Sequence, residues 1–168
     1  MNSTLLVNIF RFVLLLALQI LVFNNMNFGG YVSAFPYILF IILYPVNGNK
    51  ANLLIASFFL GLIMDLFSNS GGVHATACVL LAYLRPYFFK FSFGLSYEYQ
   101  TVKLNDVLTP ERFSFILLAV STHHITLFLL ESFQITFFLD VLLRTVLSTL
   151  FTILTCIILI YLIKPNKR

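Results

Sequence analysis

The chain has 168 residues, of which 60% are hydrophobic and 10% are charged, and its mean hydropathy is +0.98. Soluble domains are about 45–50% apolar and about 25% charged, so this composition excludes an ordinary soluble domain. The net charge of +4 comes from basic residues scattered between apolar runs, with no basic stripe. Membrane topology therefore explains the charge better than nucleic acid, which we do not expect as a partner.

The apolar residues form successive runs of about 15 to 25 residues, close to the roughly 20 that a helix needs to cross a bilayer core. Lipid offers no partners for backbone polar groups, so such runs cross it as helices. We therefore expect an all-α integral membrane protein with a single polytopic domain over 1–168. It forms a compact bundle of about six transmembrane helices, at residues 5–23, 31–46, 51–67, 73–93, 113–130 and 135–163.

The second and fourth expected helices each contain a proline. Pro36 lies near the start of the short segment Tyr31–Val46, where a helix tolerates proline only in its first turn or at a kink. Arg85-Pro86 interrupts the segment 73–93. This helix either continues through a kink or is a broken half-span.

The basic residues also predict the orientation. With the N-terminus in the cytoplasm, the longest connector, 94–112, is cytoplasmic and the three opposite connectors contain no Lys or Arg. This asymmetry follows the positive-inside rule and predicts both termini in the cytoplasm. The basic residues on the cytoplasmic side are Lys50, Arg85, Lys90, Lys103, Arg112, Lys164, Lys167 and Arg168.

Charged residues inside the expected spans are candidates for function. Asp140 and Arg144 are four residues apart and are expected to pair on one helix face, either to neutralise each other or as a polar anchor. Asp65 and Glu131 lie with Asp140 near the outer ends of their helices. They either reach headgroup water or line an outward-facing polar pocket, with Arg144 as the counter-charge.

The remaining polar residues in the spans are interpreted as structural. Arg11 extends toward the cytoplasmic surface, and His74 lies beside an outer turn. His123 and His124 are adjacent and so point about 100° apart on a helix, which argues against a shared metal. One of them is expected to form hydrogen bonds inside the bundle.

Catalytic signatures are not found in the sequence. It has no HExxH, P-loop or GxSxG pattern, and Cys78 and Cys156 lie far apart in apolar segments. We expect neither enzymatic activity nor a cofactor or metal.

The most distinctive stretch lies between residues 57 and 83. Ser57 and Gly61 form a small-residue stripe, Asp65 continues the same helix face, and Gly71-Gly72 permits a tight turn. The stripe either binds a partner helix or builds an internal helix hairpin. This pattern, with Phe35-Pro36 and the six-helix layout, resembles the bacterial rod shape-determining MreD family. Ser57 departs from that family, where glycine is frequent, and the connector 94–112 is longer than expected.

The resemblance implies a multi-pass protein of the bacterial inner membrane, surrounded by its lipids. It would be a non-enzymatic scaffold of the cell-elongation complex (the elongasome), which supports rod shape and lateral peptidoglycan synthesis. Its partner would be the single-span shape protein MreC, and through it peptidoglycan synthases and the MreB-like cytoskeleton.

A second hypothesis comes from the fold that this resemblance implies. The MreD fold is thought to be similar to the membrane substrate-binding subunit of vitamin importers, which has six short helices and an outward pocket. Those subunits dock an ATPase-bound partner through an Ala-x-x-x-Ala-like face on the first helix. Here Ala17 is the only alanine of that helix, which argues against the importer.

Overall fold

The computed structural model describes residues 3–28, 31–94, 108–132 and 138–163. Among these residues, the short elements are the 3₁₀ helices η1 (Phe23–Asn25) and η2 (Pro36–Ile38) and an antiparallel pair of strands, β1 (Asn27–Phe28) and β2 (Val32–Ser33). The described α-helices are α1 (Ser3–Leu21), α2 (Leu39–Ile42), α3 (Lys50–Ser68), α4 (Val73–Phe93), α6 (Pro110–Ser132) and α7 (Phe138–Ile163).

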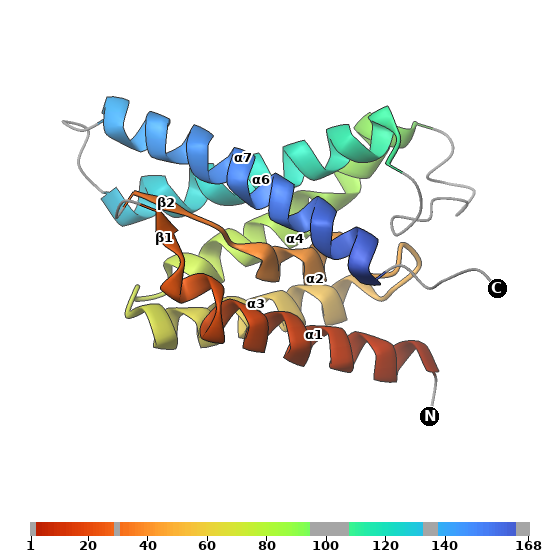
Figure 1. Ribbon diagram of the computed structural model, residues 1–168. Coiled ribbons are helices and arrows are strands. Elements are labelled where there is room, and N and C mark those ends of the chain that lie inside the picture. The colour runs from red at the N-terminus through yellow and green to blue at the C-terminus, as the bar shows by residue number, and fades with distance from the viewer. Residues whose placement is uncertain (1–2, 29–30, 95–107, 133–137, 164–168) are drawn as a thin grey trace.

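The long helices lie side by side and run between two ends of an elongated bundle (Figure 1). α1 begins and α7 ends at the same end, and the β1–β2 hairpin lies at the other. α4 packs against α3 on one side and α6 on the other, and α6 packs against α7. Thus α4 lies in the middle of the described bundle.

Four of the described helices are long and apolar enough to cross a membrane: Leu5–Asn25, Lys50–Ser68, Pro110–Ser132 and Leu139–Leu162. Large apolar side chains on their outer faces remain exposed, including Phe10 (67%), Leu66 (76%) and Leu139 (77%). Such faces suit hydrocarbon rather than water. The chain is therefore an all-α, multi-pass membrane protein, as the composition predicts.

Local sequence explains where α3 begins and ends. The side chain of Asn49 accepts a hydrogen bond from the Ala51 N–H at 2.8 Å and so caps the first turn. Asn69 follows the last turn in the left-handed conformation, with φ of 53°. Gly71 and Gly72 also have positive φ, and Gly72 precedes α4 directly. The chain thus reverses direction within a few residues.

α4 is one continuous helix of 21 residues that runs through Pro86. The structure therefore excludes the broken half-span. Its polar residues keep it out of the group of four apolar helices, and two of them, His74 and Arg85, are buried inside the bundle. A central helix can carry such residues because its neighbours provide hydrogen-bond partners.

The expectation of a helix over residues 31–46 is wrong. The segment passes through β2 and η2 and has α-helical structure only in the four residues of α2. Pro36 lacks an N–H and disfavours helical conformation at Phe35, the residue before it. No helix can therefore run through residues 31–35 into Pro36. Residues 36–43 are nevertheless buried, and residues 37–43 have exposed fractions of 8% or less. Irregular backbone at this depth needs partners from other elements.

Side chains of α1 and α7 bond the N-terminal part of this segment. Gln19 donates to the carbonyl of Ala34 at 3.1 Å and accepts from the Tyr37 N–H at 3.4 Å. The Phe35 N–H donates to Oγ1 of Thr152 at 3.1 Å. Backbone groups around Pro36 that have no partner within a helix therefore form hydrogen bonds with polar side chains of two otherwise apolar helices.

Two arginines form hydrogen bonds with the backbone in the C-terminal part of residues 31–46. Arg11 donates to the carbonyl of Leu43 at 2.9 Å. Arg85 donates to the carbonyl of Ile42 at 3.3 Å and to that of Tyr44. These carbonyls belong to the last residue of α2 and the two residues that follow it, where a helix leaves its carbonyls unpaired and favours positive charge. Arg11 therefore has a hydrogen-bonding role inside the bundle, in addition to any contact with the cytoplasmic surface.

Candidate functional site

The motif of residues 57–72 builds the hairpin of α3 and α4. The Asp65 carboxylate accepts from the N–H groups of His74 and Ala75, both at 2.9 Å, and from the Ser70 hydroxyl at 2.5 Å. It thus caps the N-terminus of α4 from the end of α3, where negative charge is favourable.

Gly61 allows the two helices to approach each other. A Cβ at Gly61 would lie 2.4 Å from Cα of Ala75 and 2.5 Å from the carbonyl oxygen of His74. Ser57, one turn earlier, is fully buried, and Asp65 is 5% exposed. The small-residue stripe therefore faces α4 of the same chain, which corresponds to the internal hairpin rather than to an exposed partner surface.

A cluster of polar side chains lies next to this hairpin in the centre of the bundle. The Tyr37 hydroxyl is 2.8 Å from Nδ1 of His74 and 2.8 Å from Nε2 of His123. The Cys78 thiol donates to the same hydroxyl at 3.7 Å. Residues of η2, α4 and α6 thus share one hydroxyl. The sequence gives no indication of this cluster, because Tyr37 lies in an apolar run.

The His124 side chain forms its hydrogen bonds away from the Tyr37 cluster. Its Nδ1 is 2.9 Å from the carbonyl of Val120 and its Nε2 is 3.0 Å from Oγ1 of Thr152. The two adjacent histidines therefore have different partners, as their angular separation predicts. Among the described residues, no group of three or more His, Cys, Asp or Glu side chains is placed to hold a metal ion.

Replacing Thr152 with valine is expected to destabilise the protein. Oγ1 of Thr152 forms hydrogen bonds with both His124 and the Phe35 N–H, and valine, which has a similar shape, leaves these two groups unpaired. At about 1–3 kcal/mol for each unpaired group, the free energy of unfolding should fall by about 2 to 6 kcal/mol. Denaturation of the purified protein in detergent measures the change.

Thr155→Val is the matched control one turn away. Within the described part of the chain, its hydroxyl forms a hydrogen bond only with the Thr152 carbonyl of the same helix, so we expect a change of about 0.5 kcal/mol or less. Equal destabilisation by the two substitutions would contradict the role assigned to Thr152.

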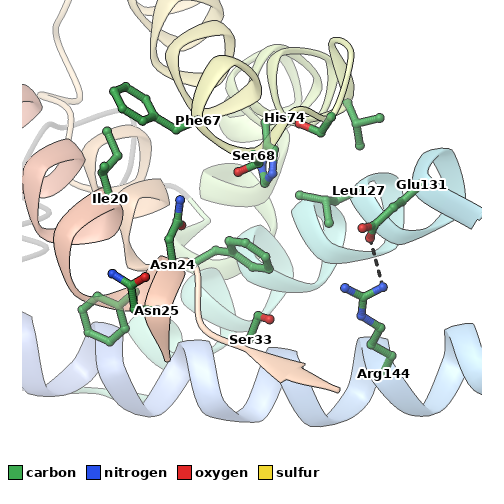
Figure 2. Close-up of a pocket in the computed structure, with 14 residues that line it drawn as sticks. Ile20, Asn24, Asn25, Ser33, Phe67, Ser68, His74, Leu127, Glu131 and Arg144 are labelled. Carbon is green, nitrogen blue, oxygen red and sulfur yellow. Dashed lines mark ion pairs between the residues drawn. The ribbon is translucent and has the colours of Figure 1, made fainter. Parts of the chain in front are cut away.

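A pocket of about 430 Å³ opens near the ends of α1, α3 and α6, beside the start of α4. Polar side chains from several elements face this space (Figure 2). Glu131 and Arg144 lie in its wall and form an ion pair, with Nη1 and Oε2 at 3.1 Å. The guanidinium of Arg144 also lies 4.6 Å from the centroid of the Phe128 ring.

The ion pair differs from the expected one. Arg144 pairs across helices with Glu131, and no described contact joins it to Asp140. The backbone carbonyl of Asp140 accepts from the Tyr31 hydroxyl at 2.9 Å. Helical spacing permits Asp140 and Arg144 to meet, but packing of α6 against α7 brings Glu131 within reach instead.

The expected outer polar cluster is therefore present only in part. Glu131 and Arg144 line the pocket, whereas Asp65 is occupied with the cap of α4 and does not. Sequence reasoning missed His74 as a lining residue, although its position directly after Gly71-Gly72 places it at the start of α4. A scan against protein-family models, a search of curated proteins and a search of solved structures each found no match.

Proposed function

We propose that this protein is a non-enzymatic scaffold of the bacterial cell-elongation complex, an MreD-like protein that supports rod shape through MreC. It lies in the inner membrane with both termini in the cytoplasm and six membrane passes, formed by α1, residues 31–46, α3, α4, α6 and α7. The common end of α1 and α7 in the bundle supports that orientation, together with the charge asymmetry (Figure 1).

The α3–α4 hairpin is the observation that carries the proposal. The most distinctive residues of the resemblance, between 57 and 75, form one unit, in which Gly61 admits the backbone of Ala75 and Asp65 caps α4. The spacing of Gly61 and Asp65 is required by the packing of the hairpin. A resemblance in such a spacing is better support for membership of a family than one in residues without a structural role. Since the motif itself is buried, MreC would bind another face, and the apolar outer faces of the helices provide the area.

Affinity purification from native membranes tests the partner. The full-length tagged protein, extracted in mild detergent, should recover a single-span MreC-like protein together with peptidoglycan synthases. A tagged multi-pass protein of unrelated function, expressed at the same level, is the control and should recover neither. Recovery of an energy-coupling ATPase without an MreC-like protein would contradict the scaffold.

The pocket favours a second candidate, the substrate-binding subunit of a small-molecule importer. Its volume and its ion pair suit a polar ligand. Depletion of the protein distinguishes the two functions. The scaffold predicts rounded or widened cells with unchanged vitamin uptake, whereas the importer predicts normal shape and growth that depends on an external vitamin.

A further inference from the structure

The polar pocket has the dimensions of a ligand-binding site. Its volume of about 430 Å³ falls in the usual range of about 300–1,000 Å³ for small-molecule sites. The side chains that line it include aromatic rings and hydrogen-bonding groups from η1, β2, α3, α4, α6 and α7 and their flanking turns (Figure 2). The bonds that these groups already make determine what each still offers to a ligand.

Three lining side chains already use either their donor or their acceptor in a hydrogen bond within the protein. Oδ1 of Asn24 accepts from Gln19 at 3.0 Å, so its NH₂ group is left to donate. Asn25 has the opposite arrangement, because its Nδ2 donates to the Leu21 carbonyl at 3.1 Å and its Oδ1 is left to accept. The Ser70 hydroxyl donates to Asp65, so its oxygen is left to accept.

The Tyr37 cluster determines what His74 offers. Nδ1 of His123 is buried without a hydrogen-bond partner among the described residues. A buried unpaired N–H is costly, and unpaired acceptors are tolerated better, so the His123 proton belongs on Nε2, where it donates to Tyr37. The one hydroxyl hydrogen of Tyr37 then donates to Nδ1 of His74. His74 consequently carries its own proton on Nε2, and it lines the pocket as a donor.

The charges in the wall compensate each other. Glu131 and Arg144 are paired at 3.1 Å, so the wall has no net formal charge from this pair. An anionic ligand would have to compete with Glu131 for Arg144. A cationic ligand would have to compete with Arg144 for Glu131. The donors include Asn24, His74 and Arg144, and the acceptors include Asn25, Ser70 and Glu131. The hydroxyls of Ser33 and Ser68 also line the pocket and can donate or accept.

We propose that the pocket binds a small, uncharged polyhydroxyl molecule, about the size of one sugar unit. Each hydroxyl group both donates and accepts, which matches a wall that presents donors and acceptors from neighbouring residues. Phe23, Phe35 and Phe67 also line the pocket and offer apolar contact to C–H groups of such a ligand. Binding goes beyond the scaffold function and stands or falls separately from recovery of MreC.

Ligand-observed NMR on the full-length protein in lipid nanodiscs tests the proposal. The probes are D-glucose and N-acetyl-D-glucosamine, with succinate as an anion and choline as a cation. We expect saturable binding of at least one sugar, with a dissociation constant on the order of 1 mM, and weaker binding of both ions. Preferential binding of succinate or choline would overturn the uncharged class. Failure of both sugars to saturate would overturn the site.

Variants establish where binding occurs. The double substitution Glu131→Leu with Arg144→Leu removes one acceptor and one donor without changing the net charge, and should weaken sugar binding about tenfold or more. Asn52→Leu removes an exposed polar side chain near the start of α3, at the other end of that helix, and should leave binding unchanged. Thermal unfolding of each variant confirms that the bundle is intact. Unchanged binding in a folded double variant would place the sugar elsewhere and contradict the proposal.

Discussion

Replacing Gly61 with alanine should destabilise the protein by about 3 kcal/mol or more, the upper end of the usual cost of overpacking. The added methyl group would lie within 2.6 Å of three backbone atoms of His74 and Ala75, and backbone at a helix terminus cannot rotate away as a side chain does. α4 must therefore move, which also strains its cap by Asp65. This cost outweighs the gain of about 1 kcal/mol that alanine brings to a helix interior. Chemical unfolding in detergent measures the difference.

Gly61→Leu extends the same test, and we expect no folded protein to be recovered. Ala51→Leu is the control at the start of the same helix, where the side chain is exposed and the change should remain within about 0.5 kcal/mol. Equal yields of folded Gly61→Leu and Ala51→Leu protein would show that α3 and α4 do not meet at Gly61.

Replacing Arg85 with methionine should lower the free energy of unfolding by about 2 to 6 kcal/mol. Arg85 is 6% exposed and donates to the carbonyls of Ile42 and Tyr44, so the substitution leaves both without this donor. Each unpaired buried group costs about 1–3 kcal/mol. The guanidinium also lies 4.6 Å from the centroid of the Phe89 ring, and this contact is lost as well. Thermal and chemical unfolding of the purified protein measure the loss.

Lys90→Met is the matched control for charge. It removes one positive charge from the exposed side of the last turn of α4 and leaves the backbone of residues 31–46 untouched. Its effect should remain within about 0.5 kcal/mol. Equal destabilisation by the two substitutions would mean that the loss of Arg85 acts through charge. Its hydrogen bonds to residues 42 and 44 would then be unimportant.

Most of the helices could be predicted from the sequence. The expected segments 51–67, 73–93 and 113–130 correspond to α3, α4 and α6, because long apolar runs bounded by Asn, Gly, Ser or Pro have one outcome in lipid. Residues 31–46 are the exception. An apolar run has the same composition whether it is a helix or an irregular buried segment, and the difference depends on Gln19, Thr152 and Arg85 from distant elements.

The candidate site was less predictable for the same reason. Spacing along one helix predicts that Asp140 and Arg144 share a face, but it contains no information on which residues a neighbouring helix presents. Glu131, from α6, takes the place of Asp140. The Tyr37 cluster likewise depends on three elements meeting. The cap of α4 by Asp65 was not expected either, because the sequence predicts Asp65 at headgroup water or in a polar pocket; only the hairpin of α3 and α4 was among the alternatives.

Thiol labelling of spheroplasts tests most directly that the chain crosses the membrane with both termini in the cytoplasm. Cys78 and Cys156 are fully buried, so the native protein should give little background. Single substitutions Ala51→Cys and Ser68→Cys place exposed thiols near the two ends of α3. A membrane-impermeant maleimide should label Ser68→Cys in intact spheroplasts and Ala51→Cys only after permeabilisation. Labelling of Ala51→Cys alone before permeabilisation, or of both variants, would contradict this orientation of the bundle.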